Sequence, residues 1–216
     1  MKKIKGVIFD LDGTLINTID DITDSLNAVL VKYGYKTYTP DECKMMICDG
    51  PRVLVQRALP KDADDTLTDK LLAEYKQYYY DHACIKTKPY DGIVELLLDL
   101  EKLGVQTAIV TNKPQPTMEF LIDKLFKNIN FVSLAGFSDA VPHKPDPYQT
   151  NQVILKMGVC RDEVLFAGDS AVDMNTAKNA QVAGVGVTWG FRPKEELDKS
   201  GAKYIIDYPH QLLDII

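Results

Sequence analysis

The sequence has no excess of basic residues. Its 25 lysines and arginines are outnumbered by 31 aspartates and glutamates, which gives a formal net charge of −6 at pH 7. A nucleic-acid-binding surface usually needs a basic patch that neutralises phosphates, so we expect no nucleic-acid partner. An anionic substrate would have to be held locally by lysines, backbone amides or a metal ion, against a mildly repulsive overall field.

Long hydrophobic runs and paired cysteines are also missing. No stretch approaches the roughly 18 apolar residues of a membrane-spanning helix. The apolar residues that follow the basic start of the chain are too few for a signal peptide, because Asp10 and Asp12 interrupt them. The four cysteines form no C-x-x-C pair, so we expect reduced thiols and no disulfide framework. These absences predict a cytoplasmic protein with no membrane partner.

Short and nearly continuous apolar runs are what the sequence does contain. They lie at residues 6–9, 105–110, 131–135, 164–167, 182–187 and 204–206. Strands that are buried on both faces of a parallel sheet have this pattern. Amphipathic segments of helical length separate most of the runs, at residues 93–103, 117–125 and 147–157. We therefore expect an α/β fold with a doubly wound parallel sheet, whose ligands bind at the carboxyl ends of the strands.

The stretch between residues 17 and 88 breaks this alternation, because it contains helical patterns and no convincing strand. Helices are expected at residues 19–33, 41–47, 53–59 and 67–80. An all-helical insertion after the first strand predicts two domains. The core would comprise residues 1–16 and 88–216, and residues 17–87 would form a smaller helical domain. A lid hinged over the strand ends is the simplest use of such an insertion.

Polar residues lie after four of the predicted strands, at their carboxyl ends. They are Asp10 with Asp12, Thr111 with Asn112, Lys144, and Asp169 with Asp173. Taken alone, each cluster could be a turn, a helix cap or an acid in a first helical turn. Four clusters at the same edge of one parallel sheet favour a shared site instead.

The chemistry of these side chains indicates phosphoryl transfer. Asp10 and Asp169, with Asp173 as a further candidate, offer the oxygen ligands that Mg²⁺ prefers. The three histidines are scattered and the cysteines unclustered, which argues against a zinc site. Thr111, the backbone amide of Asn112 and Lys144 would donate to phosphate oxygens. A carboxylate that attacks phosphorus would form an aspartyl phosphate.

Read in chain order, these clusters resemble the four motifs of the haloacid dehalogenase-like hydrolases. The matching strings are D-L-D-G-T-L at residues 10–15, T-N at 111–112, K-P at 144–145, and G-D-S at 168–170 followed by Asp173. The resemblance implies that Asp10 is the nucleophile and a metal ligand. It implies that Asp12 is the general acid and base, and that its backbone carbonyl binds the metal. The acid at position 12 is typical of the family's phosphatases and phosphomutases, and the dehalogenases lack it.

The same resemblance implies roles for the remaining motif residues. Thr111 and Lys144 would bind phosphate, with Lys144 also orienting Asp10. Asp169 would bind the metal directly, and Asp173 directly or through water.

Within this family the chain most resembles phosphoglycolate phosphatases with a small helical cap. The supporting strings are V-T-N-K-P at residues 110–114, T-W-G-F-R at 188–192 and D-G at 49–50. Gly50 would belong to the substrate loop, and Arg52 is either a surface residue of the cap or a second clamp on the substrate. Cys48 stands where these enzymes usually have a glycine, and Asn17-Thr18 replaces a common Asp-Ser. These departures bear on the substrate and leave the metal chemistry unchanged.

The expected protein is therefore a Mg²⁺-dependent phosphatase of a small phosphorylated metabolite, as a monomer or homodimer. A phosphomutase similar to β-phosphoglucomutase shares every core motif and stays an alternative, although Arg52 follows Gly50 by two residues and not by the three usual in mutases. A pyrophosphatase, sugar-phosphate phosphatase or nucleotide phosphatase is a further alternative. A phospho-accepting receiver module also uses clustered aspartates, but receivers are shorter and have no helical insertion.

Overall fold

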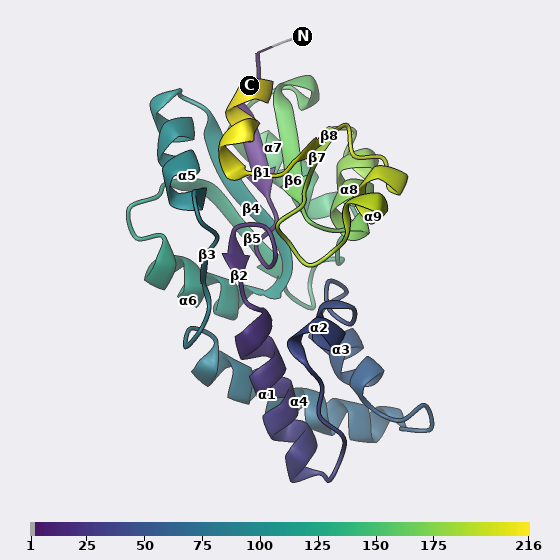
Figure 1. The fold of residues 1–216 in the computed structure, drawn as a ribbon. Helices are drawn as coiled ribbons and strands as arrows, with labels where there is room; N and C mark the ends of the chain where they lie inside the picture. Colours follow the sequence, from purple (N-terminus) through teal and green to yellow (C-terminus); the bar gives the residue numbers. More distant parts are fainter. Residues whose placement is uncertain (1–2) are drawn as a thin grey trace.

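A six-stranded parallel sheet forms the centre of the computed structural model, which describes residues 3–216 (Figure 1). The strands follow the order β5-β4-β1-β6-β7-β8, and every neighbouring pair is parallel. Their bounds are Gly6–Phe9 (β1), Gln106–Pro114 (β4), Phe131–Phe137 (β5), Val164–Gly168 (β6), Ala183–Val187 (β7) and Tyr204–Ile206 (β8). The predicted α/β fold is confirmed. Residues 1 and 2 of the expected core segment 1–16 lie outside the described residues.

The central strand β1 explains why its sequence is apolar without alternation. Val7 and Phe9 belong to one hydrophobic cluster, and Ile8 between them belongs to another. Successive side chains of a strand point to opposite faces, so both faces of β1 must be covered. Helices supply that cover, with bounds Ile93–Lys102 (α5), Gln115–Leu125 (α6), Tyr148–Met157 (α7), Ala171–Asn179 (α8) and Lys194–Lys199 (α9).

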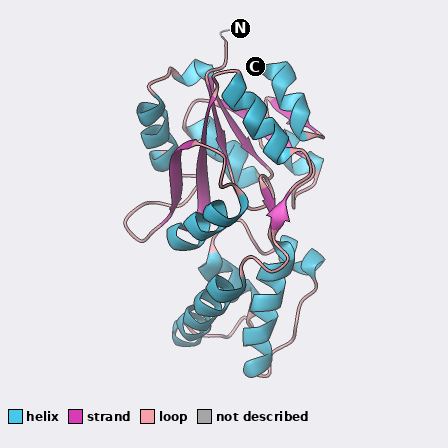
Figure 2. Cartoon of the chain, turned by 90° about the vertical axis from the view of Figure 1, so that its left-hand side faces the viewer, coloured by secondary structure: helices cyan, strands magenta, loops and turns pink. Residues whose placement is uncertain are grey.

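Four further helices lie together beyond the carboxyl ends of the strands (Figures 1 and 2). Their bounds are Ile19–Lys32 (α1), Pro40–Lys44 (α2), Pro51–Ala58 (α3) and Asp65–His82 (α4). Local capping sets where two of them begin. Thr39 and Glu42 form a reciprocal capping box at α2, and the Asp64 carboxylate accepts from the Leu67 amide at 2.7 Å at α4. Such caps satisfy amides that have no partner within the helix.

The chain passes between the sheet and these helices twice, and a short ribbon joins the two passages. Strands β2 (Ile16–Asn17) and β3 (Lys88–Pro89) pair antiparallel. These strands are not predictable from the sequence, because two residues carry no periodicity. Buried Asp21 accepts hydrogen bonds from the backbone amides of residues 85–87 at 2.8–3.1 Å. This carboxylate therefore holds the returning segment against the first turn of α1. Among residues 3–216, no helix combines the length and apolar character needed to cross a membrane.

Cys48, which stands at a usual glycine position, adopts a glycine-like backbone with φ of 93°. Left-handed conformations cost a side-chain-bearing residue about 1–2 kcal/mol, whereas the extra freedom of glycine in the unfolded chain costs about 0.5–1 kcal/mol. Cys48→Gly is therefore expected to raise the free energy of unfolding by about 0.5 kcal/mol in urea denaturation. Cys160→Gly is the control, because Cys160 has an ordinary φ of −78° and should lose stability. An equal loss in both variants would contradict the strain at Cys48.

Candidate active site

The four predicted polar clusters meet at one edge of the sheet. Asp10 follows β1, Thr111 lies in β4, Lys144 lies in the loop after β5, and Asp169 follows β6, with Asp173 in the first turn of α8. Strands β4, β1 and β6 are neighbours, so their carboxyl ends bring these residues together. Asp10, Thr111, Lys144 and Asp173 border a cavity of about 630 Å³ between the sheet edge and the helices α1, α3 and α4. Asp169 lies buried behind them.

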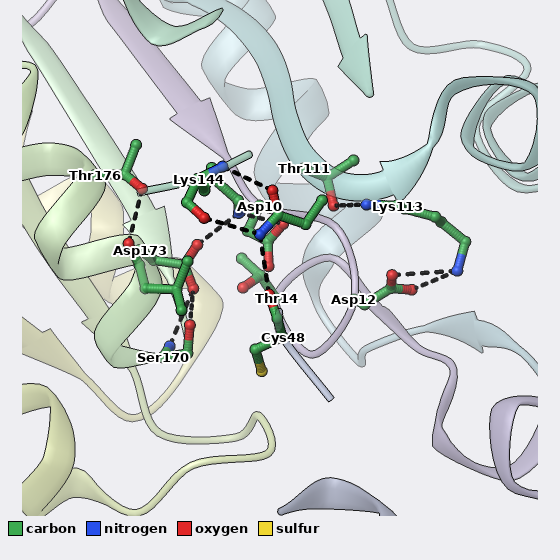
Figure 3. A network of polar contacts seen from close by, with 12 residues as sticks. Asp10, Asp12, Thr14, Cys48, Thr111, Lys113, Lys144, Ser170, Asp173 and Thr176 are labelled. Atoms are coloured by element: carbon green, nitrogen blue, oxygen red, sulfur yellow. Dashed lines mark hydrogen bonds and ion pairs between the residues drawn. The ribbon is translucent and has the colours of Figure 1, made fainter. Parts of the chain in front are cut away.

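Lys144 links two of the aspartates. Its ammonium lies 2.8 Å from Oδ1 of Asp10 and 2.7 Å from Oδ1 of Asp173, and its side chain is 3% exposed (Figure 3). The other oxygen of Asp173 accepts from the hydroxyl of Ser170 at 2.6 Å and from its amide at 3.1 Å. Asp173 therefore caps α8 and fixes Lys144, which in turn orients Asp10.

Asp169 is fully buried beside two glycines that make room for it. Its Oδ2 accepts from the amide of Phe191 at 2.7 Å, and its Oδ1 accepts from the hydroxyl of Thr14 at 3.4 Å. A Cβ at Gly13, where φ is +85°, would lie 2.4 Å from Oδ2 of Asp169, and a Cβ at Gly190 would lie 2.2 Å from its Cβ. Only glycine lets these two backbone segments approach the carboxylate so closely.

Three buried carboxylates can share a cation here. Asp10, Asp169 and Asp173 each offer an oxygen, and these atoms lie within 4.8 Å of one another. Oδ1 of Asp10 is buried and makes no hydrogen bond within residues 3–216, although it is in ionic contact with Lys144. One ammonium cannot balance three carboxylates, and an all-oxygen donor set suits a hard divalent cation. The residues therefore fit a metal ion.

Two of the carboxylates, Asp10 and Asp169, hold protons more tightly than an exposed carboxylate. Burial raises the pKa of Asp10 to about 6, although Lys144 opposes the shift and Asp173 adds to it. Burial and the neighbouring acids Asp173 and Asp10 also raise the pKa of Asp169. Burial alone would lower the pKa of Lys144, but the carboxylates of Asp10 and Asp173 outweigh it and raise that pKa. Lys144 is therefore a permanent cation of the site.

We expect the stabilising effect of Mg²⁺ to grow with pH. Since the pKa values of Asp10 and Asp169 are higher in the folded state, the metal-free protein loses stability as pH rises from the ordinary carboxyl range through about 6. A cation at 100 times its Kd adds about 2.7 kcal/mol, or about 5–10 °C in Tm for a chain of this length. This shift should appear at pH 8 and shrink at pH 5, where protons compete for the carboxylates.

Thermal denaturation with MgCl₂, against NaCl of equal ionic strength, measures the effect of Mg²⁺ on stability. An Mg²⁺-induced Tm shift of the same size at both pH values would contradict the coupling between protons and metal.

Thr111 and Asn112 lie where the sheet pairing is interrupted. The register between β4 and β5 shifts between Val110 and Pro114, so residues 111–113 have no regular partner on β5. The Asn112 side chain accepts from the Lys144 amide at 2.8 Å and donates to the Cys48 carbonyl at 3.0 Å. It thus fixes two loops that border the site, and leaves Thr111 and the local backbone to face a ligand.

Asp12 turns away from the other carboxylates. Its two oxygens lie 2.9 and 3.1 Å from the ammonium of Lys113, which also donates to the Tyr79 hydroxyl at 2.6 Å. Figure 3 shows this pair apart from the group formed by Asp10, Lys144 and Asp173. Lys113 belongs to the V-T-N-K-P string, but the sequence predicted no role for it. Its place two residues after Thr111, at the carboxyl end of the same strand, was the available signal.

The two predicted residues of the helical segment differ in position. Gly50 borders the cavity, and a Cβ on it would lie 3.0 Å from the ring of His143. Arg52 is not among the cavity residues. Its guanidinium pairs with Asp65 at 2.8 Å and with Asp69 at 3.1 Å. The structure therefore brings Gly50 to the site and leaves Arg52 on the surface, and we expect Arg52→Ala to leave the substrate KM unchanged.

Comparison with known proteins gives a consistent set of relatives. The family model described as haloacid dehalogenase-like hydrolase matches residues 7–187. A phosphoglycolate phosphatase of Colwellia psychrerythraea is 32% identical, over 96% of this chain and 94% of that protein. An N-acetylmuramic acid 6-phosphate phosphatase of Pseudomonas aeruginosa is 29% identical, over 99% of this chain and 95% of that protein.

A solved structure has nearly the same fold. The protein comes from Lactobacillus delbrueckii subsp. bulgaricus, and its assignment as a phosphoglycolate phosphatase is itself provisional. It superposes with a TM-score of 0.94 at 32% identity, covering 100% of this chain and 99% of that one. The match of the family model over most of the chain, together with these relatives, shows that the chain belongs to the haloacid dehalogenase-like hydrolase family.

Proposed function

We propose that this protein is a Mg²⁺-dependent phosphatase that hydrolyses small phosphomonoesters through an aspartyl phosphate on Asp10. The observation that carries the proposal is the placement of Asp10. Its carboxylate is held by Lys144 at 2.8 Å, within a group of three carboxylates that could hold a metal, and it borders the cavity. A nucleophile, a fixed cation and a metal site at one cavity are what phosphoryl transfer needs.

Asp10 and Asp169, together with the backbone carbonyl of Asp12, would hold the metal. Both oxygens of Asp173 already have partners in Lys144 and Ser170, which favours contact through water for Asp173. When bound, Mg²⁺ supplies charge neutralisation at the phosphate and the attacking carboxylate.

The chain's own residues then divide the reaction between them. The Thr111 hydroxyl, the backbone amide of Asn112 and Lys144 hold the phosphate oxygens. Asp10 attacks phosphorus in line. Asp12, once it has left Lys113 and taken up a proton from solvent, gives that proton to the departing alkoxide. Asp12 then removes a proton from the water that hydrolyses the aspartyl phosphate. Asp12 must turn away from Lys113 to reach the leaving oxygen. Its carboxyl group therefore has two positions in the cycle, one paired with Lys113 and one beside the reacting phosphate.

We propose residues 17–87 as a cap domain over a core of residues 1–16 and 88–216. The separate placement of the helices α1 to α4, beyond the strand ends, supports this division (Figures 1 and 2). Side-chain contacts join the two parts. The side-chain amide of Asn112 donates to the carbonyl of Cys48 at 3.0 Å. Arg192 donates to the carbonyl of Ile47 at 3.0 Å, and Lys113 donates to the hydroxyl of Tyr79 at 2.6 Å. Gly50, beside the first of these contacts, would shape the substrate loop. Closure of such a cap excludes water from the reaction.

Phosphoglycolate is the first substrate to test, and N-acetylmuramic acid 6-phosphate is the second. They are the substrates named for the relatives at 32% and 29% identity. Each is a phosphomonoester that also carries a carboxylic acid, so the pair defines a chemical class. The enzyme is proposed to act in the cytoplasm, consistent with its four free cysteines. It is proposed to be a monomer or a homodimer.

A panel of phosphomonoesters, with pyrophosphate added as a phosphoanhydride, tests this function when it is assayed with Mg²⁺ and with EDTA. The panel comprises both carboxylate-bearing esters, p-nitrophenyl phosphate, pyrophosphate, sugar phosphates and nucleotides. We expect phosphate release that EDTA abolishes. Glucose 1-phosphate distinguishes a phosphatase from the mutase alternative, since a mutase would isomerise it without releasing phosphate. Absence of phosphate release from every ester would overturn the proposal.

A further inference from the structure

Lys113 is a buried cation with a single counter-charge. Its side chain is 2% exposed, and within residues 3–216 its only ion-pair partner is Asp12, at 2.9 Å. It also donates to the hydroxyl of Tyr79 on α4, whose ring lies 4.6 Å away. The ammonium therefore lies at the boundary between β4 and the helical segment, on the wall of the cavity.

Of the lysines that line this cavity, Lys113 would interact most strongly with an anionic ligand. The described cavity wall contains three lysines, Lys76, Lys113 and Lys144. Lys144 is already held by Asp10 and Asp173. Lys76 is exposed on α4, where water screens its charge. A buried ammonium interacts more strongly with an anion, because little water competes for it.

The pairing of Lys113 with Asp12 cannot persist through the proposed reaction. Asp12 must turn towards the leaving oxygen, and Lys113 would then lose its counter-charge. A buried charge left without a partner is strongly unfavourable. Tyr79 cannot replace Asp12, because burial raises the pKa of its hydroxyl and keeps it neutral. A second anion must therefore approach Lys113 as Asp12 leaves.

The position of Lys113 indicates which part of the substrate carries that anion. Lys113 lies two residues beyond Thr111 in β4, a separation of roughly 7 Å along a strand. Thr111 and Lys144 are proposed to hold the phosphate. The Lys113 ammonium thus lies on the alcohol side of the phosphoester, towards Tyr79 and the helical segment.

We propose that Lys113 is a substrate-binding residue that takes a carboxylate on the alcohol part of the ester, in exchange for Asp12. This inference rests on the proposed phosphatase function and deepens it. It makes the preferred substrates phosphomonoesters of hydroxy acids. Binding of the substrate carboxylate releases Asp12 for proton transfer, so recognition and catalysis are coupled through one ammonium.

Two esters of equal size test the proposal, namely 2-phosphoglycolate and 2-hydroxyethyl phosphate, which has an alcohol in place of the carboxylate. The wild-type protein is expected to favour phosphoglycolate by about 100-fold in kcat/KM, as for a buried charge pair. Lys113→Met keeps the length of the side chain and removes its charge. It should reduce this preference to about threefold or less, mostly through KM. Because the two esters are compared within each variant, a general loss of activity cancels.

Two controls separate the outcomes. Lys76→Met removes the exposed lysine of the same cavity and should keep the wild-type preference, whereas Lys113→Arg should retain most of it. An unchanged preference in Lys113→Met, or its loss in Lys76→Met, would overturn the role of Lys113. Equal wild-type rates on the two esters would do so without any variant, even if Lys113→Met fails to fold. In those cases phosphate release from either ester or from p-nitrophenyl phosphate would leave the phosphatase function standing, and its absence from every ester would overturn both.

Discussion

Replacing Asp10 by asparagine is expected to lower kcat on every phosphomonoester by at least about 10⁴-fold, because an amide cannot attack phosphorus. The fold should survive. Asparagine has nearly the same shape, and Lys144 keeps Asp173 as an ion-pair partner at 2.7 Å. The two measurements are steady-state phosphate release and the Tm of the variant.

Asp123→Asn provides a matched control for this variant. Asp123 is exposed on α6, and the same change there should leave kcat unaltered. The intermediate can be detected directly by borohydride reduction of the acid-quenched wild-type enzyme, which converts an aspartyl phosphate to homoserine at position 10. Turnover by Asp10→Asn within tenfold of the wild type would remove Asp10 from the role of nucleophile.

Asp12→Asn is expected to have the second largest effect, and the effect should depend on the leaving group. Loss of a general acid or base typically lowers the rate by about 10²–10⁴-fold. Alkyl phosphates need a proton on the leaving oxygen, so their first step should slow by this amount. p-Nitrophenolate departs without a proton. With that substrate the variant should release one equivalent of p-nitrophenol in a burst, followed by slow hydrolysis of the aspartyl phosphate.

Stopped-flow absorbance with p-nitrophenyl phosphate measures the burst, and quenched-flow detection of the released alcohol measures the first step with the alkyl ester. A loss of equal size in the first step of both substrates would contradict the acid role of Asp12. The variant also leaves Lys113 without its counter-charge, so the Tm should be compared with that of Asp123→Asn. A fall in Tm with unchanged kinetics would show that Asp12 stabilises the fold and takes no part in catalysis.

The local pattern of the sequence was sufficient for the sheet. The apolar run at 6–9 became β1 with the same bounds, Gly6–Phe9, and the run at 204–206 became β8, Tyr204–Ile206. Burial on two faces imposes this pattern, and it is visible in a few consecutive residues. The run at 105–110 extended to Pro114 in β4, because β4 and β5 resume pairing beyond the polar residues that interrupt it.

Elements that depend on distant partners were not predictable in the same way. The ribbon of β2 and β3 joins Ile16 to Pro89, and the sequence around each residue has no pattern that predicts the pairing. Arg52 was expected to be either a surface residue of the cap or a substrate clamp, and in the fold Asp65 and Asp69 lie close enough to bind it. For a surface guanidinium, the nearest carboxylate decides the orientation, and sequence does not reveal which carboxylate is nearest.

The sequence by itself determined that Asp10, Asp12, Thr111, Lys144 and Asp169 would follow strands of one parallel sheet, because chain direction alone places such residues at a common edge. Only the tertiary structure decided which charge each of them faces. Asp12 pairs with Lys113 at a separation of 101 residues, and Lys113 meets Tyr79 across 34. Distance in space and exclusion of water determine which charges pair, and neither quantity can be derived from the order of the residues.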